Sequence, residues 1–392
     1  MRIAYVCADP GVPVFGTKGC SIHVQEVIRA FVRQGHDVVL FAQRIGGTPP
    51  PELTSVTVWP LPSLASTDTA ARERDALAAN DRILMLLERQ GPFDMVYERY
   101  SLWSHAGMTH AANHHIPGLL EVNAPLIEEQ ATHRVLIDRR GAETVAQHVF
   151  GSASALIAVS DDVAKYLIGA NAPAERVHVV PNGVDPDRFT PDVAPASPAA
   201  EEVFTVGFVG TLKPWHGLPD LIDAFAVLRL AAPNARLLIV GTGPEQAALE
   251  QDLALRGLTD AAEFTGAVSP ADVPAYIASM DVAVAPYPKM DTCYFSPLKV
   301  FEYMASGRAV VGSRNGQLGT IIDHGVDGLL YEPGDTTALS VALVRLYRDA
   351  SLRYRLGANA RFKILKSHSW SATAERMHRL AFSNVASIGV AA

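Results

Sequence analysis

The chain shows one pattern twice: short apolar strands alternate with amphipathic helices, and this alternation constrains the fold more than any single motif. The first series begins with a strand at residues 2–7, and the second begins with a strand at residues 204–209. Between them, residues 186–202 are rich in Pro, Ala, Asp and Glu without apolar periodicity, so we expect a linker there. Alternating strands and helices predict a parallel sheet with helices on both faces. The sequence therefore predicts an α/β protein with two doubly wound, Rossmann-like domains.

The two domains are expected to span residues 1–185 and 203–369, with a last helix around residues 370–383. A chain of 392 residues is long enough for two such domains. The net charge of −8 argues against a nucleic-acid partner, which would require a basic face. The three cysteines show no framework spacing, so we expect a reduced, cytoplasmic protein. No apolar run has the length that a membrane-spanning helix needs.

Glycine-rich loops follow several predicted strands, and glycine allows a backbone to approach a phosphate closely. Residues 210–217 follow the first strand of the second half, and Lys213 in this loop could neutralise a pyrophosphate. The alternative is an ordinary connection with a solvated lysine, but the order of the elements favours phosphate binding. In the first half, residues 10–19 form a long loop, and Gly16 and Gly19 permit a backbone wrap towards phosphate.

Residues 294–307 carry the clearest chemical layout. Pro297 suits the first position of a helix, because its missing N–H would be unpaired there. The N–H groups of that first turn have partial positive charge and can bind an anion. Lys299 adds a full charge in the same turn, and Glu302 lies one turn further on, where it could accept hydrogen bonds from a diol. This layout predicts binding of a phosphate followed by a ribose.

These motifs together resemble the retaining GT-B glycosyltransferases of family 4, and the likeness extends over nearly the entire chain. The donor helix of that family has a Glu, seven intervening residues and a second Glu before a helix end of small residues. Glu302 and residues 304–307 match the second half of this pattern, whereas Tyr294 stands where the first Glu would be. Residues 181–189 match the interdomain hinge signature, so the acidic pair within it is expected to be structural and not a metal site.

The resemblance implies a GT-B fold, in which the domains face across a cleft and the last helix (residues 370–392) crosses back to the first domain. It also implies a nucleotide diphosphate sugar as donor, without cofactor or metal. Relatives have an Arg and a Lys where Thr211 and His216 stand, so Lys213 and His216 are expected to supply the positive charge. The donor-site candidates are Gly16, Gly19, Gly210, His216, Gly241, Val268, Tyr294, Ser296, Pro297 and Leu298, and the catalytic candidates are Lys213, Lys299 and Glu302.

Polar residues at the ends of two first-half strands are the candidates for an acceptor site. Glu98 and Arg99 end one strand, and Glu121 and Asn123 lie at the end of another. Such positions border the ligand crevice of a doubly wound sheet, although a turn or cap role is equally compatible with each residue. Many relatives have a His where Asn123 stands, so we assign no catalytic base.

Three histidines, His110, His114 and His115, have the spacing of residues on one helix that could hold a metal ion. A third ligand and its supporting groups are not identifiable from the sequence. We therefore expect a surface helix without metal.

The sequence thus predicts a retaining transferase, similar to bacterial enzymes of natural-product or surface-glycan biosynthesis, that moves a sugar from a nucleotide diphosphate to a hydroxyl group of a small-molecule or saccharide acceptor. One alternative is a GT-B epimerase or hydrolase, and another is a non-catalytic nucleotide-sugar-binding subunit that activates a partner. Tyr294 in place of the first Glu, with Asp291 beside it, leads to the hypothesis of an unusual donor sugar, deoxy or amino. The base, the acceptor and the oligomeric state are left open.

Overall fold

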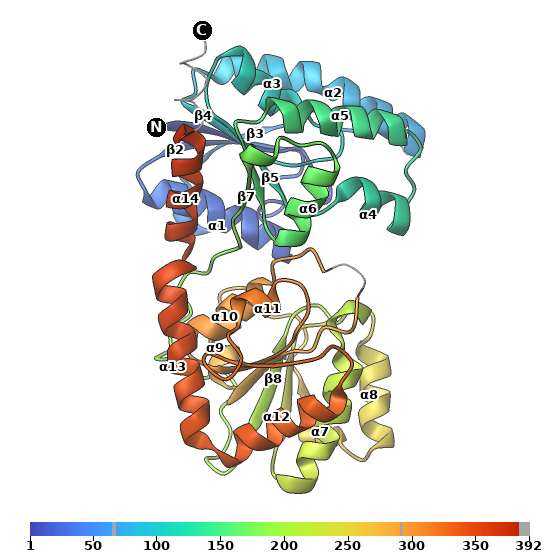
Figure 1. The fold of residues 1–392 in the computed structure, drawn as a ribbon, viewed down its shortest axis with the longest axis vertical. Helices are drawn as coiled ribbons and strands as arrows, with labels where there is room; N and C mark the ends of the chain where they lie inside the picture. Colours follow the sequence, from blue (N-terminus) through green and yellow to red (C-terminus); the bar gives the residue numbers. More distant parts are fainter. Residues whose placement is uncertain (65–67, 291–292, 384–392) are drawn as a thin grey trace. The chain divides into compact units, whose positions relative to one another are not determined.

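The structure is a computed structural model that describes residues 1–64, 68–290 and 293–383, and the chain divides into two compact units. Unit 1 contains Met1–Asn182, the short segment Tyr294–Ser296 and the chain from Trp370, and unit 2 contains Gly183–Cys293 and Pro297–Ser369. Each unit is built on one parallel sheet with helices on both faces, which confirms the predicted fold class (Figure 1).

The sheet of unit 1 has seven parallel strands in the order β3-β2-β1-β4-β5-β6-β7. Helices α1 and α14 pack together on one face, and α2, α3 and α5 cover the other (Figure 1). The strands are β1 (Arg2–Cys7), β2 (Asp37–Ala42), β3 (Thr57–Pro60), β4 (Met95–Arg99), β5 (Gly118–Val122), β6 (Ala155–Ala158) and β7 (Val177–Val179). The helices are α1 (Gly19–Arg33), α2 (Thr69–Gln90), α3 (Ala106–Asn113), α4 (Leu126–His133), α5 (Arg139–Ser152), α6 (Asp161–Gly169) and α14 (Trp370–Ser383), with 3-10 turns η1 (Pro51–Leu53) and η2 (Ala174–Arg176).

Helix α1 shows how the apolar pattern selects this packing. Val24, Val27, Ile28 and Phe31 recur at helical spacing and are fully buried against the sheet. The helix ends before Gly35, whose φ of +80° and hydrogen bond to the carbonyl of Val32 form a left-handed cap. The helix expected from the sequence is therefore confirmed.

The sheet of unit 2 has six parallel strands in the order β10-β9-β8-β11-β12-β13. The strands are β8 (Thr205–Val209), β9 (Arg236–Val240), β10 (Ala262–Phe264), β11 (Val282–Ala285), β12 (Ala309–Ser313) and β13 (Leu329–Tyr331). The helices are α7 (Leu218–Ala231), α8 (Gln246–Leu255), α9 (Val273–Ala278), α10 (Leu298–Ala305), α11 (Leu318–Ile321), α12 (Thr336–Arg348) and α13 (Ala350–Ser367), with 3-10 turns η3 (Pro214–His216) and η4 (Thr259–Ala261).

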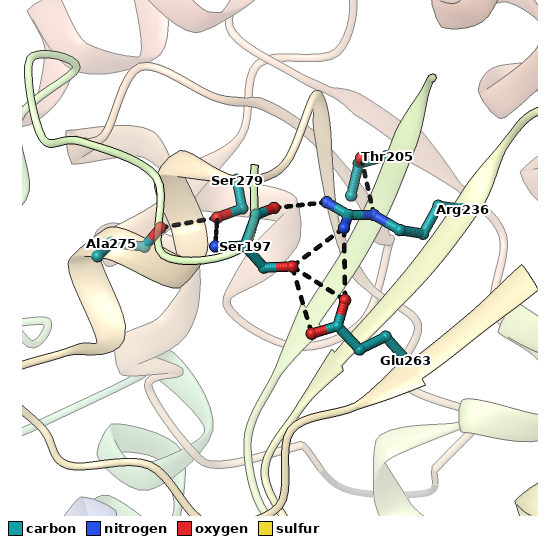
Figure 2. Close-up of polar contacts among 6 residues, drawn as sticks. All are labelled: Ser197, Thr205, Arg236, Glu263, Ala275 and Ser279. Atoms are coloured by element: carbon teal, nitrogen blue, oxygen red, sulfur yellow. Dashed lines mark hydrogen bonds and ion pairs between the residues drawn. The ribbon is translucent and has the colours of Figure 1, made fainter. Parts of the chain in front are cut away.

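The segment 186–202, expected to be a linker, is anchored within unit 2 (Figure 2). Arg236, at the start of β9, donates to the carbonyl of Ser197 at 2.7 Å and forms an ion pair with Glu263 at 3.4 Å. The backbone N–H of Ser197 donates to the hydroxyl of Ser279 at 3.0 Å, and its own hydroxyl donates to Glu263 at 2.9 Å. Hydrogen bonds therefore hold this segment in place where apolar periodicity is lacking.

Candidate active site

The strand order of unit 2 places a ligand crevice at the carboxyl ends of β8 and β11, where the direction of winding reverses. Gly210 follows β8 and Gly241 follows β9, with φ of +146° and +135°, a region that favours glycine. A Cβ atom on Gly241 would lie 2.1 Å from the carbonyl oxygen of Gly210. The backbones of the two glycine loops therefore touch, and Gly266, after β10, forms a bridge with Gly241.

Helix α10 is attached to this edge by its own side chains. The hydroxyl of the fully buried Tyr303 accepts a hydrogen bond from the backbone N–H of Val209 at 2.7 Å, which fixes α10 against the end of β8. The helix begins at Leu298, so Pro297 is the N-cap and not the first helical residue that the sequence predicted. The cap carries no side-chain hydrogen bond and the first turn contains no acidic residue, which suits an anion.

The small residues that end α10 have a packing role. Gly307 adopts φ of +66° after the helix, and a Cβ atom on Gly357 of α13 would lie 2.0 Å from the carbonyl oxygen of Gly307. The guanidinium of Arg361 in α13 donates to the carbonyls of Ala305 and Phe189. Positive charge at a helix C-terminus is stabilising, and here it also connects α10 with the hinge motif.

Lys299, in the first turn of α10, lies beside the carboxyl end of β8. Its Nζ lies 4.0 Å from the ring centroid of Phe208 and 5.7 Å from that of Tyr287. The Nζ atom is inaccessible and has no hydrogen-bond partner among the described residues. Burial lowers the pKa of Lys299 to about 7, although the charge of Glu302 opposes this shift. A buried amine without a hydrogen-bond partner is costly, so Lys299 is a candidate for contact with a negatively charged ligand.

His216 is a neutral side chain in this site. Its Nδ1 contacts the carbonyl oxygen of Thr211, and because a carbonyl only accepts, Nδ1 carries the proton and Nε2 a lone pair. Burial and then the charge of Lys299 lower the pKa of His216 to about 3. The imidazole therefore supplies no positive charge at neutral pH, in contrast to the expectation from the sequence, which leaves Lys213 and the protonated form of Lys299 as the predicted positive charges.

The other donor-site candidates of unit 2 lie at the same edge of the sheet. Lys213 precedes the turn η3, and its Nζ lies 5.5 Å from the ring centroid of Trp215. Glu302 is half-buried one turn after Lys299 on α10. Leu298 is the first residue of α10, and Val268 is half-buried in the loop after β10. A Cβ atom on Gly210 would lie 2.6 Å from Nζ of Lys299, so the predicted phosphate loop contacts the helix that carries Glu302.

In unit 1, the alternation of side chains along β4 separates two predicted acceptor residues. Successive residues of a strand point to opposite faces of the sheet. Glu98 is fully buried on the α3 face, where its carboxylate accepts hydrogen bonds from the hydroxyl of Ser104 at 2.6 Å and the backbone N–H of Met108 at 3.0 Å. Burial raises the pKa of Glu98 to about 7. Glu98 therefore lies inside the fold and not at the crevice.

Arg99 points to the opposite face, where it joins His23 and Glu121. Its Nη1 lies 3.0 Å from Nδ1 of His23 and 3.6 Å from Oε2 of Glu121, and Nε2 of His23 lies 3.0 Å from Oε1 of Glu121. Because Arg only donates, Nδ1 of His23 accepts and Nε2 donates to the carboxylate. Burial alone would raise the pKa of Glu121, but His23 and Arg99 outweigh it and lower this pKa to about 2.

His23 was not identified from the sequence as a site residue. It lies in the second turn of α1, shortly after Gly19, and its ring packs at 5.3 Å against Trp370, the first residue of α14. Gly19 begins α1, and Gly16 packs against Pro13 in the preceding loop. In the sequence, the feature that could have indicated a role for His23 is its position shortly after a glycine loop. Its partners came from β4 and β5, which no sequence spacing connects.

Two more polar groups are buried beside this cluster. The hydroxyl of Tyr5 and the amide nitrogen of Asn123 have no hydrogen-bond partner among the described residues. Tyr5 pairs with Tyr97 across β1 and β4, the two strands between which the winding of unit 1 reverses, and their rings stack at 5.0 Å. Arg99, Glu121 and Asn123 therefore remain as acceptor-site candidates at this edge.

The segment 294–296, expected to contact the donor, makes its described contacts within unit 1. The hydroxyl of Tyr294 donates to Glu129 at 2.9 Å, and its carbonyl accepts from the hydroxyl of Ser160 at 2.6 Å. The hydroxyl of Ser296 accepts from the backbone N–H of Asn182 at 3.1 Å. A donor role for Tyr294 and Ser296 stays a prediction, and Asp291 lies outside the described residues.

The hinge motif forms a tight turn. The buried carboxylate of Asp185 accepts from the backbone N–H groups of Asp187 at 3.1 Å and Arg188 at 3.4 Å. Asp185 therefore stabilises the turn by local hydrogen bonding, a common role of aspartate in turns.

Two doubly wound units define the class of the fold, and comparisons with known proteins agree. Residues 17–188 match the family model Glycosyltransferase Family 4, and residues 203–349 match the family model Glycosyl transferases group 1. The chain belongs to this family of GT-B glycosyltransferases and is an enzyme that transfers glycosyl groups.

Curated relatives have the same class of activity. The chain is 28% identical over 410 residues to a D-inositol 3-phosphate glycosyltransferase of Jonesia denitrificans, covering 96% of this chain and 94% of the relative. It is 26% identical to an MMP alpha-(1->4)-mannosyltransferase of Mycolicibacterium hassiacum, covering 91% and 92%. A shorter match, 29% identical and covering 50% and 52%, is to a 2-deoxystreptamine glucosyltransferase of Streptomyces kanamyceticus.

Solved structures share the fold. The Anabaena protein HepE in complex with UDP gives a TM-score of 0.71 at 19% identity, covering 98% of this chain and all 100% of that chain. A glycosyltransferase of Rickettsia africae gives a TM-score of 0.75 at 16% identity, covering 98% of both chains. Across the described part of the chain, each helix is too short or too polar to cross a membrane.

Proposed function

We propose that this protein is a retaining glycosyltransferase that uses a nucleotide diphosphate sugar and a small polyhydroxylated or saccharide acceptor. The observation that carries the proposal is the buried amine of Lys299, which lies without a hydrogen-bond partner among the described residues at the carboxyl edge of β8. A diphosphate would satisfy this amine and the backbone N–H groups at the start of α10 together.

The roles of the unit 2 residues follow from their positions. Lys299, Lys213 and the N–H groups of the first turn of α10 stabilise the negative charge that grows on the departing diphosphate. Preorganised charges of this kind commonly make the largest contribution to catalysis. Glu302, one turn further along α10, accepts hydrogen bonds from the ribose hydroxyls. The neutral His216 shapes the wall of the site, and its Nε2 lone pair can accept a hydrogen bond.

Retention of configuration results when the acceptor attacks the face from which the leaving group departs. In our proposal, an oxygen of the departing phosphate takes the proton of the acceptor hydroxyl, so no side-chain base is required. The reaction needs no metal ion, because the two lysines and the helix N-terminus supply the positive charge.

The acceptor side of the proposal rests on unit 1. Arg99, Glu121, Asn123 and the newly identified His23 offer donors and acceptors at the edge of its sheet. The relatives are named for D-inositol 3-phosphate and 2-deoxystreptamine, which are both small polyhydroxylated rings. We propose an acceptor of this kind, with the hydroxyl groups of the ring bound by these residues.

The test combines ligand binding with product analysis. A thermal-shift screen of nucleoside diphosphates identifies the base, because a ligand of the folded state stabilises it by mass action. The matching nucleotide sugars are then incubated with candidate acceptors, and NMR of the product gives its anomeric configuration. We expect transfer with retention, and loss of at least about tenfold in kcat/KM for Glu302→Ala, equivalent to about 1.4 kcal/mol. An inverted product refutes retention, nucleotide release that no acceptor changes indicates a hydrolase or epimerase, and binding without turnover indicates an auxiliary subunit.

A further inference from the structure

Two helices of unit 1 bring three metal-binding side chains together at their ends. Glu88 lies in the last turn of α2, His110 lies in α3, and His114 is the C-cap residue of α3. Oε1 of Glu88 is 3.0 Å from Nδ1 of His110 and 2.8 Å from Nε2 of His114. These ligand atoms all lie within 4.8 Å of one another. The two histidines were noticed in the sequence, but the third ligand is on a different helix and could not be.

We propose that the Glu88–His110–His114 cluster binds one Zn²⁺ ion that cross-links the C-terminal ends of α2 and α3. Two imidazoles and one carboxylate are a ligand set that zinc accepts, with water in the fourth position. This site is separate from the proposed sugar-transfer site, and its role is structural.

The spacing of the ligand atoms suits such an ion. Zinc bonds of about 2.0–2.2 Å in a tetrahedral arrangement place neighbouring ligand atoms roughly 3.4 Å apart. The two histidine nitrogens lie 2.8–3.0 Å from Oε1 of Glu88, so each nitrogen–oxygen pair needs to separate only by a few tenths of an ångström. The rings of His110 and His114 are side by side, with centroids 4.3 Å apart, and already direct their nitrogens at the same carboxylate.

The cluster has one buried ligand, which packing holds in place, and one side that is open to solvent. His110 is 2% exposed and packs edge-on against Phe93, whereas Glu88 and His114 are exposed on the surface. The exposed side provides the path for the ion and room for a water ligand.

The electrostatic potential at the ends of the two helices also favours a cation. Helices α2 and α3 pack against each other, and both end at this cluster. The C-terminal end of each helix carries partial negative charge, which adds to the carboxylate of Glu88. Because α2 leads into β4 and α3 leads into β5, the cluster lies by the amino ends of these strands. Arg99 and Glu121 lie at the opposite, carboxyl edge, so the ion is remote from the proposed acceptor site.

The experiment measures zinc binding by full-length protein from which any affinity tag has been removed. After dialysis against Zn²⁺, we expect one zinc per chain by elemental analysis and a rise in melting temperature of roughly 5 °C in excess Zn²⁺. Isothermal titration should show affinity weakened at least about tenfold in His114→Ala and in Glu88→Gln. His133→Ala, which removes an exposed histidine at the end of α4, is the matched control and should bind like the unaltered protein.

The ligand type gives a second, independent readout. X-ray absorption at the zinc edge should show only nitrogen and oxygen ligands, at about 2.0–2.2 Å, whereas a cysteine ligand would appear at about 2.3 Å. Both variants change exposed side chains, and circular dichroism verifies that they fold. Substoichiometric binding, a sulfur ligand to the zinc, or equal affinity in His114→Ala and the unaltered protein would each overturn the proposal.

Discussion

Protonation of Lys299 should be coupled to binding of the nucleotide. Burial lowers the pKa of this lysine to about 7, so the unliganded site holds a largely neutral amine above this pH. A bound diphosphate places negative charge beside Nζ and raises the pKa again. Binding therefore takes up a proton, and affinity should fall as the pH rises through the slightly alkaline range.

The magnitude follows from the fraction of Lys299 that carries charge. With a pKa of about 7, roughly a quarter of the amine is protonated at pH 7.5 and roughly 3% at pH 8.5, so the dissociation constant should rise about eightfold between these values. Over this range the diphosphate is already fully ionised and contributes little change of its own. Titration calorimetry in two buffers of different ionisation enthalpy should report uptake of nearly one proton, roughly 0.8 at pH 7.5.

Lys299→Arg is the matched control, because a guanidinium stays protonated over this entire range. The Arg variant should show no proton uptake and a flat affinity between pH 7.5 and 8.5. If the unaltered protein gives the same flat profile, Lys299 is charged before the ligand arrives, and the reasoning from its burial is wrong.

Three further predictions concern stability and fold. Burial raises the pKa of Glu98 to about 7, so its contribution to stability is complete below pH 4.5 and is lost as the pH rises through about 7. The difference in unfolding free energy between the unaltered protein and Glu98→Gln, measured by urea titration, should therefore change by about 3 kcal/mol from pH 4 to pH 8. No change would mean that the carboxyl group of Glu98 is in contact with water. Gly217→Ala puts a Cβ 1.8 Å from the carbonyl oxygen of Pro286 and should lower the free energy of unfolding by roughly 2–4 kcal/mol. The control Gly257→Ala has a similar φ but no neighbour within 4 Å, and it should lower this free energy by about 1 kcal/mol. Equal losses of stability in the two variants would refute the clash. Tyr294→Phe removes the hydrogen bond to Glu129 and should lower stability by roughly 0.5–1.5 kcal/mol in thermal melts, and an unaffected melting temperature would mean that this bond is not formed in solution.

Much of the fold could be predicted from the sequence, because buried parallel strands and amphipathic helices leave a strong periodic pattern. The strand at β1 and the helix α1 illustrate this, since nearly all their apolar residues are buried. The sequence did not reveal β3 (Thr57–Pro60), whose residues are exposed or half-buried at the edge of the sheet and end in proline. The sequence of residues 186–202 predicts a linker, because the hydrogen bonds that hold this segment in unit 2 leave no periodic pattern in the sequence.

The candidate site was predicted where its residues are local in the sequence. Lys299 and Glu302 lie on one short helix, so their relation follows from helical spacing alone. The neutral state of His216 depends on a carbonyl and a charged amine brought to it by folding, and the sequence suggested the opposite charge. The split of Glu98 and Arg99 between two faces follows from strand periodicity, but which face borders the crevice depends on the helices that cover the sheet.

The contact between the two glycine loops of unit 2 has a consequence for engineering donor preference. Gly241 lies against the carbonyl of Gly210, and Gly243 lies against the backbone of Leu212, so the contact between these loops is made of main chain and admits no new side chain. Attempts to retune the enzyme for another sugar nucleotide should leave these glycines untouched. Mutant libraries are better directed at the exposed Thr211 and Trp215, whose side chains can change while the main-chain contact between the loops stays the same.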